Sequence, residues 1–252
     1  MRRFWALASV GLALSLSISA AKAAETVKIG AYYFPPFATQ TATGIGGMVA
    51  DLVDLMNEAQ DDYVFELVDT SARDRYADLA AGKFDMIAFE SPEWGWGDED
   101  VVLSDVFMTG QEIYVTRADV NRDQSFFDDV TEHKIAAVYG FHYGFADFNA
   151  DPAYLQTTYT VEQPLNPCTS LYYVQDGRAD IAIVSEAYLR KFLGNHPEFT
   201  GKFLVADKID QEYRHSFVLR PDSAPPVEEI NTLLAQLKDS GELDELFETS
   251  GF

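Results

Sequence analysis

The sequence predicts an α/β protein with two lobes, each built on a mixed sheet, joined by two crossing segments of chain. Apolar runs of strand length alternate with helical patterns along the chain. A helix–turn–strand unit occurs twice, as GKFDMIAFE at 82–90 and as GRADIAIVS at 177–185. Without the first 23 residues the chain keeps 252 − 23 = 229 residues, which is enough for two lobes of ordinary size.

Residues 1–23 have the features of a cleavable export signal. Arg2 and Arg3 give a basic start, Ala6–Ala20 is an apolar run, and Ala-Lys-Ala at 21–23 is a small-x-small cleavage site. A membrane anchor is the alternative, but the apolar run is short for a bilayer. We therefore expect export and cleavage before Ala24.

The chain is strongly acidic, with a formal net charge of −23 that becomes −23 − 3 = −26 once the three basic residues of the signal are removed. This charge argues against a nucleic-acid partner. It suits either attraction for cations or adaptation of the surface to solubility and salt, and both interpretations stay open.

The expected strands are apolar runs rich in β-branched and aromatic residues. In chain order they are Val27–Ala31, Tyr63–Val68, Met86–Phe89, Glu112–Thr116, Lys134–Val138, Thr157–Val161, Ile181–Val184, Phe203–Ala206 and His215–Leu219.

The expected helices show apolar residues at helical spacing. In Gly47–Glu58, for example, Met48, Leu52, Val53 and Met56 fall on one face. The full set is Gly47–Glu58, Ala72–Ala81, Tyr143–Phe148, Cys168–Gln175, Ser185–Leu193, Val227–Ser240 and Leu243–Thr249.

The repeated unit suggests where the two lobes divide. In each copy a glycine ends the helix, a basic residue follows, and an apolar run forms a buried strand. Chance similarity of a common unit is the alternative. We expect lobe one to hold residues 24–113 and 214–252 and lobe two to hold 114–213, with Glu112–Thr116 and His215–Leu219 as the crossings.

Several segments, in this order and spacing, resemble one known family. They are VKIGAYYFPPF at 27–37, GMVADLVDLMN at 47–57, YADLAAGKFDMIAF at 76–89 and SFVLRP at 216–221. The chain resembles the bacterial extracellular solute-binding proteins of family 3, the group that holds the polar amino-acid binders. The resemblance implies a type II periplasmic binding fold, whose lobes close on a ligand about the crossings.

In lobe one the resemblance places Phe34 where relatives stack an aromatic ring on the ligand. The exit of the third strand departs from the family, because Phe89 and Glu90 replace small hydroxyl residues and Gly97 replaces the arginine that binds the ligand carboxylate. No arginine or lysine lies between Lys83 and Arg117.

That loop offers acidic and aromatic side chains instead. Glu90, Trp94 and Trp96 suit an amine or quaternary ammonium through charge pairing and cation–π contact. The alternative is that both indoles pack the loop and Glu90 faces water.

Lobe two departs in the same way. Phe141, His142 and Tyr143 stand where relatives present hydroxyl residues at a helix start, and Ser185 stands where an aspartate pairs with the ligand amino group. Glu186, beside Ser185, either contributes to the site or caps the helix that begins there.

The motifs of metal, cofactor and nucleophile chemistry are absent from the sequence. There is no His-x-x-His, no Cys-x-x-Cys and no phosphate-binding loop. We therefore expect no metal, no cofactor and no catalytic residue.

We expect a non-enzymatic, monomeric periplasmic protein that captures a small polar or cationic solute, such as an amino-acid-like compound, an amine or a betaine. Its partner would be an inner-membrane permease of the ATP-binding cassette (ABC) type or a membrane receptor. A sensory or orphan binding module is the alternative, and an enzyme resembling cyclohexadienyl dehydratase is a lesser one. The sequence leaves the ligand, the transporter and the open–closed balance undecided.

Overall fold

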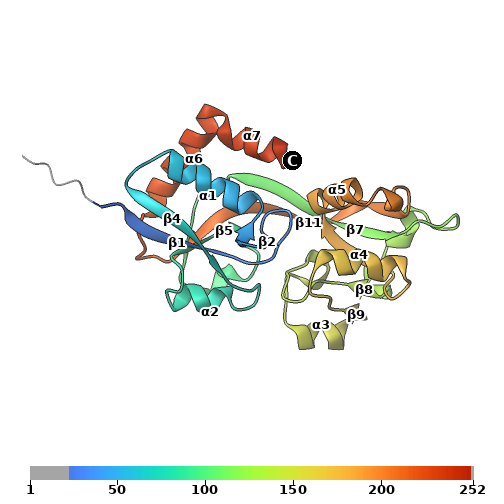
Figure 1. Cartoon of the computed structure of the whole chain (residues 1–252). Coiled ribbons are helices and arrows are strands. Elements are labelled where there is room, and N and C mark those ends of the chain that lie inside the picture. The colour runs from blue at the N-terminus through green and yellow to red at the C-terminus, as the bar shows by residue number, and fades with distance from the viewer. Residues whose placement is uncertain (1–22, 251–252) are drawn as a thin grey trace, which may run out of the picture.

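The computed structural model describes residues 23–250, so nearly all of the predicted export signal lies outside the described residues. Within 23–250, no helix is long and apolar enough to cross a membrane. The ribbon forms two bodies side by side, joined by two long strands, β7 and β11 (Figure 1).

The strands are, in chain order, β1 Glu25–Ala31, β2 Thr39–Thr41, β3 Gly44–Gly46, β4 Tyr63–Asp69, β5 Met86–Glu90, β6 Val102–Leu103, β7 Met108–Arg117, β8 Ile135–Ala136, β9 Val161–Glu162, β10 Ile181–Ser185 and β11 Phe203–Leu219. The α-helices are α1 Met48–Glu58, α2 Arg75–Ala80, α3 Pro152–Thr158, α4 Pro167–Gln175, α5 Glu186–Asn195, α6 Val227–Ser240 and α7 Glu242–Thr249. Short 3-10 turns are η1 Trp96–Asp98, η2 Gln124–Phe127, η3 Val130–Glu132, η4 Gly144–Ala146 and η5 Pro197–Phe199.

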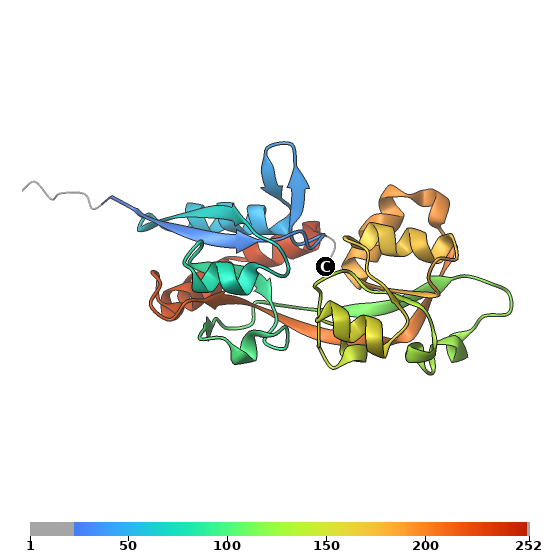
Figure 2. The same ribbon diagram turned by 90° about the horizontal axis from the view of Figure 1, so that it is seen from below.

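The main sheet runs through both bodies in the order β4-β1-β5-β11-β7-β10-β8-β9. β1 pairs in parallel with β4 and β5, whereas β11 is antiparallel to both β5 and β7. Figure 2 shows β7 and β11 running lengthwise between the bodies, with the β2–β3 hairpin projecting from the first. This mixed-sheet architecture confirms the predicted fold class.

The hydrophobic core is divided as the sheet is. One cluster of buried side chains joins β1, α1, β5, α6 and α7 in the first body. Two further clusters lie in the second body, around β7, β8 and β10. We call the two bodies lobe one and lobe two; the residue boundaries given above stay a prediction.

The expected strand at Thr157–Val161 is wrong. Residues up to Thr158 form α3, which begins with Pro152 at its first turn and is capped by Asp151, whose side chain accepts a hydrogen bond from the Tyr154 amide at 2.7 Å. The strand β9 starts only at Val161. An aspartate cap followed by proline is a strong helix start, and it outweighs the β-forming residues behind it.

Other expected elements differ in extent. Tyr143–Phe148 contains a single 3-10 turn, η4, and Asp147 and Phe148 then take positive φ angles of 50° and 58°, which end it. The strands expected at Phe203–Ala206 and His215–Leu219 are parts of one strand, β11, in which Asp207, Lys208 and Glu212 are exposed.

Candidate ligand site between the lobes

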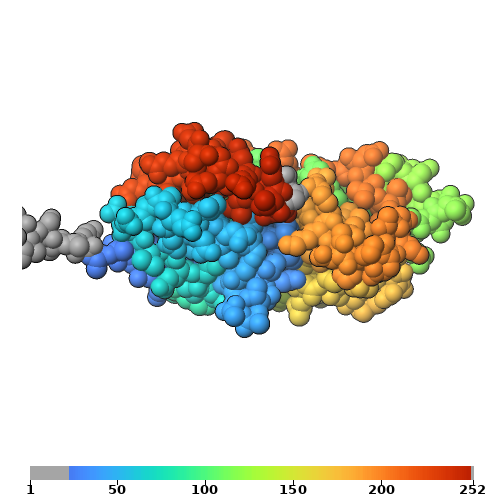
Figure 3. Space-filling model, turned by 45° about the horizontal axis from the view of Figure 1, so that its top comes forward, coloured from blue at the N-terminus to red at the C-terminus, as the bar shows by residue number. Residues whose placement is uncertain are grey.

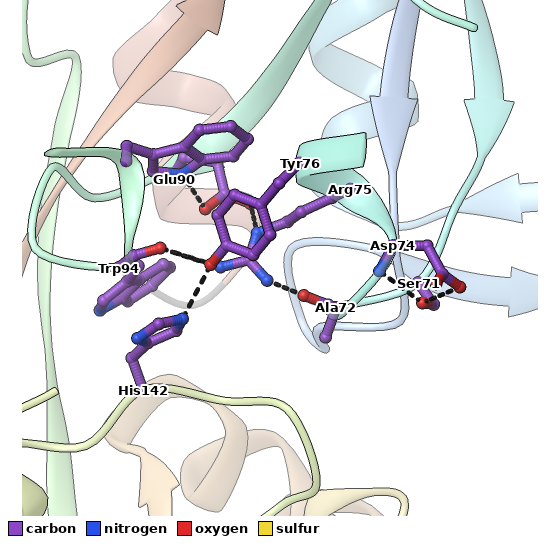
Figure 4. A network of polar contacts seen from close by, with 9 residues as sticks. Ser71, Ala72, Asp74, Arg75, Tyr76, Glu90, Trp94 and His142 are labelled. Carbon is purple, nitrogen blue, oxygen red and sulfur yellow. Dashed lines mark hydrogen bonds and ion pairs between the residues drawn. The ribbon is translucent and has the colours of Figure 1, made fainter. Parts of the chain in front are cut away.

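A buried ion pair lies at the lobe-one side of the interface. Arg75 Nε is 3.1 Å from Glu90 Oε1, and the two side chains are 2% and 0% exposed. The other oxygen, Glu90 Oε2, accepts a hydrogen bond from Trp96 Nε1 at 2.8 Å. Glu90, which we expected to offer its charge to a ligand, is therefore neutralised by a side chain of its own lobe (Figure 4).

Local backbone geometry directs Glu90 inward. Phe89 has a φ of 60°, unusual for an aromatic residue, and the pairing of β5 with β11 shifts register at the same place. Complete burial raises the pKa of Glu90, while the charge of Arg75 and the Trp96 N–H oppose the rise.

Aromatic rings enclose the guanidinium of Arg75. Its central carbon lies 4.3 Å from the Tyr76 ring centroid, 5.1 Å from that of Tyr32 and 5.6 Å from that of Trp96. Its Nη2 donates to the Trp94 carbonyl at 3.2 Å, and its Nη1 donates to the Ala72 carbonyl. The cation–π arrangement expected for a ligand is thus occupied by an internal arginine.

Polar contacts hold the lobes together beside this pair. Tyr76 Oη of lobe one is 2.8 Å from His142 Nε2 of lobe two and 2.6 Å from the Trp94 carbonyl oxygen (Figure 4). Arg73 Nη1 donates to the Tyr139 hydroxyl across the same boundary. We call the Tyr76–His142 and Arg73–Tyr139 contacts the lobe latch.

His142 is neutral in this latch. Burial, with the positive charge of Arg75, lowers the pKa of His142 to about 4. Its Nδ1 lies 2.6 Å from the Phe148 carbonyl oxygen, which only accepts, so Nδ1 carries the proton and Nε2 accepts from Tyr76. The single hydroxyl proton of Tyr76 then serves either Nε2 or the Trp94 carbonyl.

Aromatic contacts close the interface next to the latch. Phe141 of lobe two packs edge-on against Phe34, with ring centroids 5.3 Å apart, and against Tyr32, with centroids 6.1 Å apart. On the face drawn in Figure 3 the atoms of the two lobes touch along their boundary. The two lobes are therefore in direct contact in this structure.

Two small cavities remain inside the closed interface, each with a volume of about 10 Å³, the room one water molecule needs. Four residues line both of them: Phe34, Glu112, Phe141 and Tyr143. Arg75, Trp94 and His142 also line the first cavity, and Ser185 also lines the second.

A wider groove, with a volume of about 390 Å³, follows the outside of the same boundary. It is lined from lobe one by Tyr33 and residues 69–74 and from lobe two by Tyr139, Phe141 and Leu165. Arg73 and Tyr139 of the latch are among these residues, and Phe141 lines both this groove and the inner cavities.

The predicted site residues gather at this interface. Phe34, Trp94, Phe141, His142, Tyr143 and Ser185 all line a cavity. Trp94 Nε1 donates to Gln211 Oε1 at 2.8 Å, and the Tyr143 hydroxyl accepts from the Val138 amide at 2.8 Å. Ser185 caps α5, where its Oγ accepts from the Tyr188 amide at 3.1 Å. Glu90 and Trp96 lie one layer behind, as partners of Arg75 and of each other.

Two residues at the interface were not singled out from the sequence. Arg75 lines the first cavity and comes from α2 rather than from the loop after β5, where relatives carry their arginine. Glu112 lines both cavities and is only 4% exposed. Its signal was an acidic residue opening an otherwise apolar crossing strand.

A metal site finds no support in the residues that the structure describes. No group of three or more His, Cys, Asp or Glu side chains there is arranged to hold a metal ion. The side chains at the interface are therefore mainly aromatic rings, together with the Arg75–Glu90 ion pair and the buried carboxyl group of Glu112.

The family assignment follows from comparison with known proteins. The family described as bacterial extracellular solute-binding proteins, family 3, matches residues 27–250, and the chain belongs to it. No curated protein matches the chain.

Solved structures share the fold at low sequence identity. The substrate-binding protein of an ABC uptake transporter from Streptococcus pneumoniae, with bound histidine, is 19% identical, with a TM-score of 0.71 over 90% of this chain and 92% of that chain. A putative ABC-transporter binding component from Wolinella succinogenes, complexed with lysine, is 17% identical, with a TM-score of 0.70 over 89% and 94%. An ancestral amino-acid-binding protein described as a precursor of cyclohexadienyl dehydratase is 20% identical, with a TM-score of 0.67 over 89% and 94%.

Proposed function

We propose that this protein is a periplasmic receptor that captures a small polar or cationic solute between its two lobes and delivers it to an ABC-type importer. In this proposal it acts as a monomer, without a cofactor and without catalysing a reaction. Family membership supports the binding task. The periplasmic location, the delivery to an importer and the class of solute go beyond family membership and are proposed here.

One observation carries the choice of solute class. The cavities between the lobes have aromatic walls, Phe34, Phe141 and Tyr143, and a buried carboxyl group, Glu112, in place of a cluster of anion-binding donors. The one guanidinium there, Arg75, is already paired with Glu90. Aromatic faces and a free acid favour a positively charged ligand.

Capture requires the lobes to part. The inner cavities have room for about one water molecule each, so a larger solute enters only when the latch and the Phe34–Phe141 contact open. The crossing strands β7 and β11 connect the lobes and would bend as hinges. Closure over the solute would then present the joined surface of both lobes to the importer.

A thermal-shift screen of the exported protein tests the proposal. Amines, quaternary ammonium compounds, betaines, amino acids, sugars and organic acids are added one at a time, and the melting temperature is recorded against concentration. We expect a concentration-dependent rise with a cationic or zwitterionic nitrogen compound. A rise only with sugars or organic acids would contradict the proposed solute class, and no rise at all would contradict the capture function.

The direct contacts between the lobes favour a second candidate, a sensory or orphan module. The latch and the Phe34–Phe141 contact close the interface by side chains alone, which suits a protein whose closed form is recognised by a membrane receptor. A protein that stays closed and binds none of the screened compounds would favour this candidate. Turnover of prephenate or arogenate by the purified protein would instead reveal an enzyme.

A further inference from the structure

We infer that the Glu112 carboxylate binds the positive charge of the ligand, and that this ligand is a small organic monocation without a carboxylate group. The inference rests on the proposed function and deepens it, because it names one residue and one chemical class.

Glu112 lies on β7, between β10 and β11, where the sheet passes from one lobe to the other; we call this part of the sheet the floor of the interface. In the sheet it pairs with Ser185 of β10 on one side and with Gln211 of β11 on the other. The register of β11 shifts between Ile209 and Gln211, so the strand is irregular at this point. A ligand resting on this floor would touch both strands that cross between the lobes and the strand that ends at Ser185.

The carboxylate of Glu112 has no partner among residues 23–250, although the residue is only 4% exposed. Asp210, close by on β11, shows the contrast, because it accepts hydrogen bonds from Tyr114 Oη at 2.7 Å, Gly144 N at 2.7 Å and Phe145 N at 2.9 Å. Glu90 has Arg75 and Trp96. A buried acid left without a partner is costly unless something outside the chain completes it.

The surroundings of Glu112 suit an organic cation. The carboxyl group borders both inner cavities, and the rings of Phe34, Phe141 and Tyr143 border the same two. Phe34 and Phe141 come from different lobes and are in edge-to-face contact, so separation of these two rings would merge the cavities beside Glu112. Alkylammonium groups pair with a carboxylate and lie against aromatic faces at the same time.

The same cavity lacks a free cation for a ligand carboxylate. Arg75 reaches it, but all three guanidinium nitrogens already face acceptors, namely Glu90 Oε1, the Ala72 carbonyl and the Trp94 carbonyl. A zwitterion would therefore bring a negative charge toward Glu112 with nothing to neutralise it. This asymmetry selects a monocation over an α-amino acid or a betaine.

Binding should release a proton. Burial, reinforced by the charge of Asp210, raises the pKa of Glu112 well above its usual range, which favours the neutral acid while the site is empty. A cation that pairs with the ionised carboxylate displaces that proton to solvent. The other ionisable groups that line these cavities or interact with Glu112 are Tyr32, Arg75, His142, Tyr143, Tyr188, Asp210 and Tyr213.

Calorimetric titration of the exported protein tests the inference. The probes are tetramethylammonium, choline and ethylammonium as monocations, with glycine betaine and L-alanine as zwitterions of similar size. We expect at least one monocation to bind more tightly than either zwitterion. Repeating the titration in buffers of different ionisation enthalpy should show that protons are released when the ligand binds.

Two glutamine variants separate the charge of Glu112 from the general acidity of the chain. Glu112→Gln keeps the shape and should weaken monocation binding by about 100-fold or more and abolish the proton release. Glu212→Gln makes the same chemical change on β11, where the side chain is exposed, and should leave affinity within about twofold.

The outcomes distinguish this inference from the proposed function. If zwitterions bind and monocations do not, or if Glu112→Gln binds a monocation as tightly as the natural protein, the inference is overturned while the capture function stands. If the natural protein binds none of the screened compounds, the function and the inference fall together.

Discussion

Glu90 and Glu112 are two buried glutamates with opposite surroundings. Glu90 faces the guanidinium of Arg75 and the indole of Trp96, whereas Glu112 faces two cavities and no partner within residues 23–250. A paired buried acid contributes to the stability of the closed fold only while its partner is present. An unpaired one lowers the stability of the empty protein and becomes useful when a ligand arrives.

Glu90→Gln should destabilise the protein by about 3–5 kcal/mol, because it leaves the buried guanidinium of Arg75 without its counter-charge. Urea unfolding measures the loss. Glu186→Gln is the matched control, since the Glu186–Arg190 pair is exposed and should cost less than about 1 kcal/mol. Equal losses in the two variants would show that the Arg75–Glu90 pair contributes no more than a surface pair.

Glu112→Gln should change how stability depends on pH. In the unfolded chain Glu112 titrates at about pH 4.3, but its pKa in the folded protein is well above the usual range. Between these two values the folded state binds more protons than the unfolded state, so the stability of the natural protein falls as pH rises, by at most about 1.4 kcal/mol per pH unit. The glutamine variant lacks this loss.

Urea unfolding of both proteins without ligand at pH 4, 6 and 8 measures the difference. The two should be equally stable at pH 4, and the variant should gain on the natural protein at pH 6 and 8. Below about pH 6.5 His142 takes up a proton in the unfolded chain but, with a folded pKa of about 4, stays neutral in the folded protein, so stability falls as the pH falls. This effect is the same in both proteins and cancels in the comparison. A constant difference across the three pH values would mean that folding does not raise the pKa of Glu112.

At the scale of elements, the segment that leads into α2 and its first turn organises the interface. Arg73 reaches Tyr139 of lobe two, Arg75 reaches Glu90, and Tyr76 reaches His142, all within four consecutive positions. Arg73 and Tyr76 are three positions apart, about one helical turn, and both reach lobe two, whereas Arg75 reaches Glu90 of lobe one. One short segment therefore links the internal ion pair to the latch between the lobes.

Tyr76→Phe should shift the lobes toward an open arrangement, because it removes the hydroxyl that contacts His142 while keeping the ring against Arg75. One lost hydrogen bond, worth about 1 kcal/mol, changes the open-to-closed ratio by about fivefold. Small-angle X-ray scattering without ligand should give a larger radius of gyration. Tyr63→Phe, which removes a hydroxyl bonded to Glu229 within lobe one, should leave it unchanged. Identical scattering from both variants would mean that the Tyr76 contact does not hold the lobes.

At the scale of the whole molecule, the sequence predicted the mixed α/β fold and the family because strand and helix patterns repeat in order along the chain. It failed where a side chain's neighbours come from distant elements. Arg75 reads as an ordinary helix residue, and nothing local indicates that Glu90 lies beside it. The prediction of a strand at 157–161 relied on its β-forming residues, although Asp151 and Pro152 upstream are a helix start. Glu112 was visible as an acid in an apolar strand, but only the pairing with Ser185 and Gln211 places it at the interface.

The net charge of the whole chain should control how fast a cationic ligand arrives. A formal charge of −23 gives a long-range attraction for cations, which salt screens over about 10 Å at 0.1 M and about 3 Å at 1 M. The association rate constant of a monocation should therefore fall several-fold between low and high salt. Contact with buried Glu112 is screened much less, so the dissociation rate constant should change little. Stopped-flow fluorescence can follow both, because Trp94 lines an inner cavity and Trp96, the one other tryptophan after residue 23, lies one layer behind it. If salt acted on dissociation alone, the acidic surface would have no part in capture, and its role would be confined to the solubility of the protein.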